Sequence, residues 1–423
     1  MPDYKRKKVK RSFRHKKSYM NTESNIYMTN KKQKSKGIVP EENVKIVRGT
    51  KYKRKTQFKV FGIAICFICV FCIVLSSLLP GGLYENIINF SYVLGHGSYP
   101  TSVSGSTVLN TVSNGSHFYV LTDTNITAYS KNGKIIFDEL HGLSNPILSV
   151  SSTRALVYDQ GGQSIYIYNL SGKIHSLQTK NNIITASVSQ NGGFAVSTHS
   201  DRYTSVATVY DKNFKQVFSW NSAKEIINNV LLNSAENKLA VSTLSVVSGQ
   251  YSTKLLILGF DSADPIHTLD LGSSLPLSVK NTGKGVSIIC DDKYKFLHWS
   301  NFDSNTVEIS GEINSFRTDK NGILIAVNRA NDRSDNTIII ISKKGEKSSE
   351  FKISNSITDI QYNKGRVYLL CDSKVNIFDK NGTLLREGTC YYGAHKFVVV
   401  GSNSVATVSD SEISKINIQE GRG

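Results

Sequence analysis

The chain is poor in the residues and motifs that mark common catalytic sites. Its 423 residues contain six cysteines, three methionines and two tryptophans. It has no Gly-x-x-x-x-Gly-Lys-Ser/Thr loop for nucleotide phosphates and no Gly-x-Ser-x-Gly turn that would present a serine nucleophile. These absences argue against a P-loop nucleotide hydrolase and an α/β serine hydrolase, and they leave no candidate nucleophile.

Histidines are few and scattered. No two stand at the spacing of metal ligands, and none forms such a pattern with a cysteine. We therefore expect histidines satisfied on strands or at the surface, and we predict neither a metal site nor a cofactor. The nine are His15, His96, His117, His141, His175, His199, His267, His298 and His395.

Cysteine usage does not indicate a disulfide framework. Cys66, Cys69 and Cys72 fall in one apolar run at three-residue spacing, which places them along one stripe of a helix. We interpret them as packing or lipid-facing residues, with helix pairing or acylation as alternatives. The others are Cys290, Cys371 and Cys390. Such an odd and sparse set predicts free, buried thiols.

Positive charge is concentrated at one end and then missing from a long stretch. No lysine or arginine lies between Lys59 and Lys131. Residues 1–59 contain 20 basic and four acidic residues, a balance of +16, so only +2 of the formal net charge of +18 belongs to the remainder. Because phosphate binding needs a clustered cationic surface, we expect no nucleic-acid partner for the main domain.

The stretch without positive charge begins with an uncharged run of 20 residues, Val60 to Leu79. A helix of this length covers a bilayer core of roughly 30 Å. Thirteen of these residues are Leu, Ile, Val or Phe, which favours insertion by roughly 4–8 kcal/mol. A buried core helix is the alternative, but it would carry polar residues along one face. We predict a transmembrane helix over residues 58–80, with membrane lipid as its partner.

The flanks of this run predict its orientation. Basic residues are retained on the cytoplasmic side, and Arg54, Lys55 and Lys59 directly precede the run. A cleaved signal peptide is the alternative, but it would have a shorter apolar region and a small-x-small cleavage site. We therefore predict an uncleaved signal anchor in a bacterial cell membrane, with the carboxyl-terminal part outside. Residues 1–57 have few apolar side chains and are expected to form a disordered cytoplasmic tail.

From about Ser106 onward the pattern changes to short alternating apolar runs, which predicts an all-β domain. A hairpin motif recurs, as in AYSKNGKIIF around Asn132 and Gly133 and in IFDKNGTLLRE around Asn381 and Gly382. For the Asn-Gly pairs we predict a two-residue turn in which both residues have positive φ, because Gly adopts that conformation freely and Asn tolerates it.

The spacing of these hairpins predicts a β-propeller. Gly133 and Gly172 are 39 residues apart, and Gly133 and Gly382 are 249 apart, or six intervals of about 41.5 residues. Four short antiparallel strands fill such a period, which is typical of propeller blades. The predicted units are residues 106–138, 146–178, 183–222, 226–271, 275–310, 313–353 and 357–388, with a partial unit at 395–418.

The partial unit leaves the blade number open between eight, which we favour, and seven. Its missing outer strand could come from residues 86–104, which would tie the two ends of the ring together. A pair of β-sandwiches is the competing fold, but sandwiches do not require a regular period. The predicted domains are a tail at 1–57, a helix at 58–80, a juxtamembrane segment with a candidate closing strand at 81–105, the propeller at 106–419, and a short tail at 420–423.

A carboxylate follows the second strand of several units. If the positions are equivalent, these residues share one rim of the ring. Turn formation explains them, because Asp bonds readily to nearby backbone; a ring of acidic side chains facing a cation or a basic partner is the alternative. They are Asp123, Asp159, Asp201, Asp291, Asp372 and Asp410.

The turns SQNGGFAVS, TDKNGILIAV and FDKNGTLLRE resemble those of WD-repeat and quinoprotein-type blades. The layout as a whole resembles a bacterial family of single-pass, membrane-anchored propellers with basic amino-terminal tails. This resemblance covers roughly residues 50–418 and implies a fold rather than an activity. The chain lacks a Trp-Asp dipeptide and the series of tryptophans found in quinoproteins, which argues against a quinone cofactor.

Three functions follow from this interpretation. We favour a binding or scaffolding module that recognises a protein or cell-envelope partner outside the membrane, because no catalytic constellation is evident. An enzyme, either a hydrolase or a lyase, with a polar site at the central channel is the first alternative. A transmembrane sensor is the second. Perturbed carboxylates converging on the channel would favour the enzyme, and an exposed apolar patch would favour a partner.

Overall fold

The computed structural model describes residues 61–72, 74, 82–282, 284–319, 322–329 and 332–420. The predicted basic tail at 1–57, with Arg54, Lys55 and Lys59, lies outside the described residues, as does part of the predicted transmembrane segment.

Residues 61–72 and 74 are helical, and their apolar side chains are solvent-exposed. Phe61 is 67% exposed, Phe67 72% and Phe71 64%. In the described part of the chain, no helix combines the length and apolar character required to span a bilayer.

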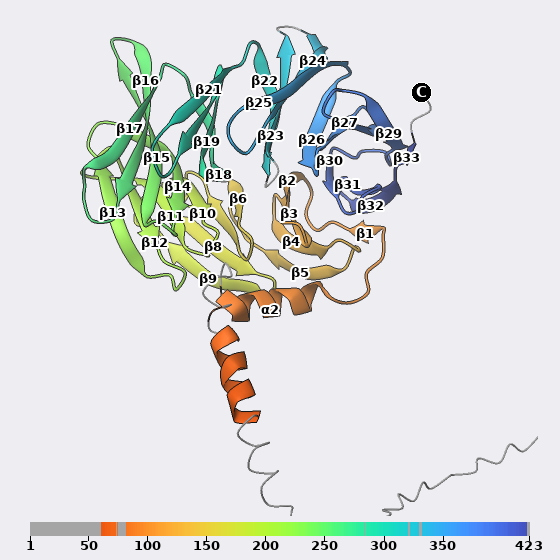
Figure 1. Cartoon of the computed structure of the whole chain (residues 1–423), viewed down its shortest axis with the longest axis horizontal. Coiled ribbons are helices and arrows are strands. Elements are labelled where there is room, and N and C mark those ends of the chain that lie inside the picture. The colour runs from red at the N-terminus through yellow and green to blue at the C-terminus, as the bar shows by residue number, and fades with distance from the viewer. Residues whose placement is uncertain are drawn as a thin grey trace, which may run out of the picture. The chain divides into compact units, whose positions relative to one another are not determined.

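The strands of the described region form eight antiparallel sheets, which follow one another around a ring (Figure 1). Sheet 1 contains β2 (Val108–Ser113), β3 (His117–Thr122), β4 (Asn125–Ser130) and β5 (Ile135–Leu140). Sheet 2 contains β6 (Pro146–Val150), β7 (Ala155–Asp159), β8 (Ser164–Asn169) and β9 (Gly172–Gln178). Sheet 3 contains β10 (Ile183–Val188), β11 (Phe194–His199), β12 (Ser205–Tyr210) and β13 (Gln216–Ser222). Sheet 4 contains β14 (Ile226–Asn233), β15 (Lys238–Val247), β16 (Gln250–Gly259) and β17 (Pro265–Gly272).

The second half of the ring repeats this order. Sheet 5 contains β18 (Pro276–Thr282), β19 (Gly285–Cys290), β20 (Lys293–His298) and β21 (Ser304–Glu308). Sheet 6 contains β22 (Glu312–Asp319), β23 (Gly322–Arg329), β24 (Asp332–Ile341) and β25 (Lys347–Ser354). Sheet 7 contains β26 (Ile357–Asn363), β27 (Arg366–Cys371), β28 (Lys374–Phe378) and β29 (Leu384–Thr389). Sheet 8 contains β30 (Lys396–Val399), β31 (Ser404–Val408), β32 (Glu412–Asn417) and β1 (Thr101–Ser102).

The prediction of an all-β propeller with eight four-stranded blades is therefore confirmed. The outer strand of sheet 8 is β1, which pairs with β32 through Thr101 and Ile413. At the other end of the chain, β33 (Gln419–Glu420) adds a fifth strand to sheet 7 by pairing with β29. The sequence did not suggest this addition, because a two-residue strand has no periodicity to detect.

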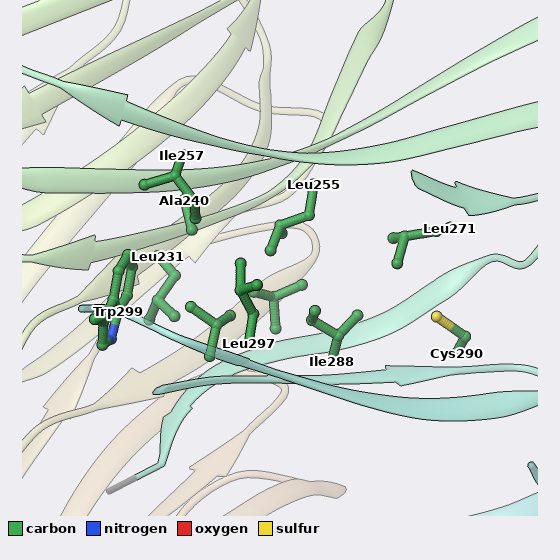
Figure 2. Packing of buried hydrophobic residues seen from close by; sticks show 11 residues of the cluster. Leu231, Ala240, Leu255, Ile257, Leu271, Ile288, Cys290, Leu297 and Trp299 are labelled. Atoms are coloured by element: carbon green, nitrogen blue, oxygen red, sulfur yellow. The ribbon is translucent and has the colours of Figure 1, made fainter. Parts of the chain in front are cut away.

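The core is divided among the junctions between neighbouring sheets. Between sheets 4 and 5, Leu231, Leu255 and Ile257 pack against Ile288 and Leu297 (Figure 2). The first and last sheets are joined in the same way, since Phe118 and Val120 of β3 pack against Val398 and Ala406. Burial between adjacent sheets, instead of in one central core, explains why each unit needs its neighbours for stability.

The Asn-Gly turns differ from the prediction. In the turn between β4 and β5 the N–H of Ser130 donates to the carbonyl of Lys134 at 2.9 Å, so three residues form the loop. Gly133 has φ +87°, whereas Asn132 does not have positive φ. The predicted two-residue turn is wrong here because a type I turn followed by one glycine with positive φ closes the hairpin with a bulge.

A helix joins the ring to the residues before it. α2 (Gly82–Val93) occupies the first half of the predicted juxtamembrane segment 81–105, and the closing strand β1 follows it. Asn89 donates from Nδ2 to the carbonyl of Thr153 at 3.1 Å and accepts from the N–H of Leu170 at 3.1 Å. Glu85 pairs with Arg154 at 2.7 Å. α2 is thus tied to sheet 2 through both an amide and a carboxylate side chain.

Sheet 1 holds the end of this helix. Lys134 Nζ donates to the carbonyls of Tyr92 at 3.0 Å and Leu94 at 2.7 Å. A cation at the last carbonyls of a helix satisfies acceptors that have no partner within the helix. Gly133 allows the chain that follows the helix to pass close to this turn, because a Cβ at position 133 would lie 2.6 Å from the carbonyl oxygen of Ser98.

Candidate partner-binding face

The order of strands gives the ring two different faces. In sheets 1 to 7, the turns between the first and second strands and between the third and fourth strands lie at one face, as does the turn between the first and second strands of sheet 8. We call this the hairpin face, and it carries α2. The opposite face, which we call the link face, contains the turns between second and third strands and the links from one sheet to the next.

The six predicted acidic residues all lie at the link face, each in a different sheet. Asp123 Oδ1 accepts from the N–H groups of Ser106 at 2.8 Å and Thr107 at 3.2 Å. These backbone hydrogen bonds lower the pKa of Asp123. Through these two bonds Asp123 fixes the residues that lead into its own sheet. This contact supports the turn interpretation for Asp123.

Asp159 and Asp291 repeat that contact. Asp159 Oδ1 accepts from the N–H of Asn145 at 2.7 Å, and Asp291 Oδ1 accepts from the N–H of Leu275 at 2.8 Å. The recurrence follows from the antiparallel pairing, because the end of each second strand lies beside the start of the first.

The other three acidic residues have individual surroundings. Asp410 Oδ1 accepts from the N–H of Val108 at 2.7 Å and so joins sheet 8 to sheet 1. Hydrogen bonds from Lys180 and Asn181 lower the pKa of Asp201. Asp372 has φ +52° and forms a turn. The six residues belong to six different sheets, and a cation or basic partner for them stays a prediction.

An ion pair crosses the inner strands at the axis of the ring. Arg317 of β22 donates to Asp359 of β26 at 3.2 Å and to the carbonyl of Thr111 of β2 at 3.2 Å. Asp359 Oδ2 also accepts from the N–H of Phe397 at 3.1 Å. This cluster connects sheets 6, 7, 8 and 1, so its charges are used in holding the ring together.

Among the described residues, the carboxylates whose pKa is lowered by hydrogen bonds lie in separate turns. They are Asp123, Asp201 and Asp379. Within the described ranges, no three His, Cys, Asp or Glu side chains gather as a potential metal site. The carboxylates therefore give no support for acid–base chemistry at the channel.

An exposed apolar hairpin is the feature of the link face that the sequence interpretation missed. β15 and β16 are ten residues long, but β14 pairs only as far as Leu244 and β17 only as far as Thr253. Residues 245–252, which we call the β16 tip, pair only with one another (Figure 1, upper left). Val246 is 65% exposed, Val247 59% and Tyr251 52%.

The β16 tip is built to stand away from its sheet. Ser248 and Gly249 have φ of +52° and +81°, as expected for a two-residue hairpin turn whose twist matches that of its strands. The signal in the sequence was the uncharged stretch LSVVSGQYST at residues 244–253, where the apolar alternation runs past the usual strand length.

Solved structures of low sequence identity are similar to this chain. The designed protein Ika8 matches with 12% identity and a TM-score of 0.55, over 75% of this chain and 98% of its own. The carboxyl-terminal WD40 domain of Sif2 matches with 10% identity and a TM-score of 0.50, over 78% and 100%. BamB from Moraxella catarrhalis matches with 11% identity and a TM-score of 0.48, over 75% and 99%. At such identities the likeness to Ika8 and to the Sif2 domain shows the fold alone.

Curated protein sequences contain no match to the chain. One family model does match, over residues 95–418, which run from the end of α2 through the last strands of the ring. Since these residues make up most of the 423, the chain belongs to the family of unknown function DUF5711.

Proposed function

We propose that the protein is a bacterial, membrane-anchored propeller that binds a protein partner outside the cytoplasmic membrane. In this proposal residues 58–80 cross the bilayer once, residues 1–57 are the cytoplasmic tail, and residues 81–105 connect the anchor to the propeller at 106–419, followed by a tail at 420–423. The uncharged run from Val60 to Leu79 and the basic residues Arg54, Lys55 and Lys59 support this topology. Exposed apolar side chains along residues 61–72 also favour a lipid environment.

The β16 tip is the single observation that best supports a binding role. Soluble proteins normally protect such edges with lysine, proline or a covering element, because unpaired strand groups recruit other chains. Residues 244–253 contain no charged residue and no proline. An apolar hairpin with free edges favours a protein that adds a strand or packs an apolar surface against it.

Protease protection tests the topology. In cells whose wall has been gently removed, external protease should degrade the part after residue 105 and leave the amino-terminal tail intact. A carboxyl-terminal part that is protected until the membrane is permeabilised would contradict the proposal.

Site-specific crosslinking tests the binding role. A photoreactive phenylalanine analogue at Tyr251 should give a discrete crosslinked product in cells, and Val247→Lys should reduce its yield at least fivefold. Val217, which is 46% exposed on β13, is the matched control for both substitutions. Equal crosslinking from positions 251 and 217, or a yield insensitive to Val247→Lys, would count against the β16 tip as the contact.

A further inference from the structure

α2 has two sides of opposite character. Glu85 and Asn89 lie on the side that contacts the propeller, where Asn89 is 8% exposed. Ile87 and Phe90 lie on the other side, and Leu94, directly after the helix, continues their spacing of three and four residues along one stripe. Their exposures are 59%, 66% and 55%.

This apolar stripe lies close, along the chain, to the proposed anchor. Leu79 ends the apolar run and α2 begins at Gly82. Three residues span at most about 11 Å. If the run crosses the bilayer, the first turn of α2 is therefore held near the level of the lipid headgroups.

Lysines are concentrated on the hairpin face, which also carries α2. The turns between third and fourth strands of sheets 1 to 3, together with the second residue of β9, carry five lysines. Two acidic side chains lie there, Asp211 and Glu139, and Glu139 Oε1 accepts from the N–H of Lys173 at 3.1 Å. The carboxylate of Asp211 is occupied, since it accepts from the N–H groups of Asn213 and Lys215, each at 2.9 Å. The lysines are Lys131, Lys134, Lys173, Lys212 and Lys215.

The link face of the same three sheets lacks this excess. Its turns and links, together with the last residue of β7, carry four acidic and three basic residues, which nearly cancel. They are Asp123, Asp159, Asp201, Glu225, Lys180, Arg202 and Lys224. The propeller is close to neutral as a whole. In sheets 1 to 3, however, the hairpin face has an excess of positive charge and the link face does not.

We propose that the outer stripe of α2 and the lysines around it form a lipid-binding surface, through which the hairpin face rests on an anionic bilayer; this rests on the anchor proposed above. Apolar side chains of an interfacial helix enter the headgroup boundary, and lysines beside it attract acidic lipids. The link face, with the β16 tip, then faces away from the membrane and stays open to a partner.

Fluorescence of the full-length chain in vesicles tests this surface. The substitution Phe90→Trp places a reporter on the stripe, and Tyr392→Trp, at a fully exposed position of a link between sheets 7 and 8, is the matched control. The vesicles contain phosphatidylcholine with brominated acyl chains and phosphatidylglycerol at 3:1. Wild-type spectra are subtracted to remove Trp220 and Trp299.

We expect the bromine to quench Phe90→Trp at least twofold and to leave Tyr392→Trp unchanged. Replacing phosphatidylglycerol with phosphatidylcholine, or combining Phe90→Trp with Lys131→Glu, Lys173→Glu and Lys215→Glu, should reduce the quenching at least twofold. If neither the removal of phosphatidylglycerol nor the three lysine substitutions reduced the quenching, the proposed attraction between these lysines and acidic lipids would be overturned.

Three other outcomes separate the possible failures. Phe90→Trp that floats with the vesicles but emits as in water overturns this inference and leaves the anchor standing. Blue-shifted emission without quenching would mean that protein, such as a second copy, covers the stripe, and would also overturn it. A chain that does not float with the vesicles would overturn the anchor and this inference together.

Discussion

Arg154 and Glu85 form an ion pair at 2.7 Å that joins the propeller to α2 across 69 positions of sequence. Both side chains are nearly buried, at 9% and 12% exposure. Arg154 Nη1 also donates to the carbonyls of Gly192 at 2.9 Å and Lys212 at 2.7 Å. Sheet 3 therefore holds the guanidinium in place, and α2 docks onto a charge that is already positioned.

Replacing Glu85 should loosen α2 and spare the ring. In Glu85→Gln the arginine keeps its carbonyl partners but loses its counter-charge, which costs about 1–3 kcal/mol. Amide hydrogen exchange of residues 82–93 should accelerate roughly tenfold or more, while exchange in β3 and β19 stays constant. Glu236→Gln, which removes an exposed partner of Lys238, is the control and should change neither region.

Removing the carboxylate of Asp359 should weaken the whole ring. Its side chain is 3% exposed and serves both Arg317 and the N–H of Phe397. Asp359→Ala leaves the partly exposed guanidinium of Arg317 and the buried N–H of Phe397 without this acceptor, so we expect a loss of about 1–3 kcal/mol in the free energy of unfolding. Asp359→Asn retains an acceptor oxygen and should lose less. Unfolding midpoints of both variants equal to that of the wild type would show that the ion pair contributes nothing.

Ring closure should depend on one backbone donor. The N–H of Val103 donates to the carbonyl of Ser411 at 3.0 Å, directly after β1. Val103→Pro removes this donor, and the loss of one such bond costs about 1–3 kcal/mol. Val103→Ala keeps the donor and is the matched control. If both variants unfold at the same temperature, the contact beside β1 does not hold the ring shut.

The stability of sheet 1 should fall in mild acid because of His117. Burial lowers the pKa of His117 to about 4 from an ordinary value of 6.5. The unfolded chain then binds a proton first as the pH falls from 6.5 to 4, so stability decreases over this window by about 3 kcal/mol. Chemical unfolding of the detergent-solubilised chain at pH 7 and pH 4.5 measures the change. His117→Gln should reduce this difference between the two pH values. An unchanged difference would show that His117 is not its source.

Two substitutions at Asp123 distinguish a turn from a ligand site. Its carboxylate accepts two backbone N–H groups. Asp123→Asn keeps an acceptor oxygen and should retain most of the stability, whereas Asp123→Ala should lower the unfolding temperature by roughly 2 °C. Loss of partner crosslinking in both variants, without a change in unfolding, would instead indicate the acidic binding ring.

Local patterns predicted the strands well. The unit predicted at 183–222 spans β10 to β13 from Ile183 to Ser222. This agreement is expected because alternation with period two and turn residues act over a few positions. The Asn-Gly turns were the exception, since whether a loop has two or three residues depends on the pairing register of the flanking strands.

Contacts between distant residues could not be predicted in the same way. The hydrogen bond from the N–H of Val108 to Asp410 spans 302 positions, and the local sequence around either residue does not predict the other as its partner. The sequence shows the long apolar alternation of the β16 tip, but its exposure depends on β14 and β17, which end before it. The docking of α2 likewise needs Asn89 to meet Thr153 and Leu170 from different turns.

The sequence by itself determined that charge is segregated, that an apolar run follows the basic residues, and that four-stranded units recur about every 41.5 residues. Tertiary structure alone decided that eight sheets close into one ring, that β1 completes the last of them, and which face carries α2. The reason is physical: periodicity and turn chemistry are properties of neighbouring residues, whereas closure and docking depend on surfaces that exist only after the sheets have packed.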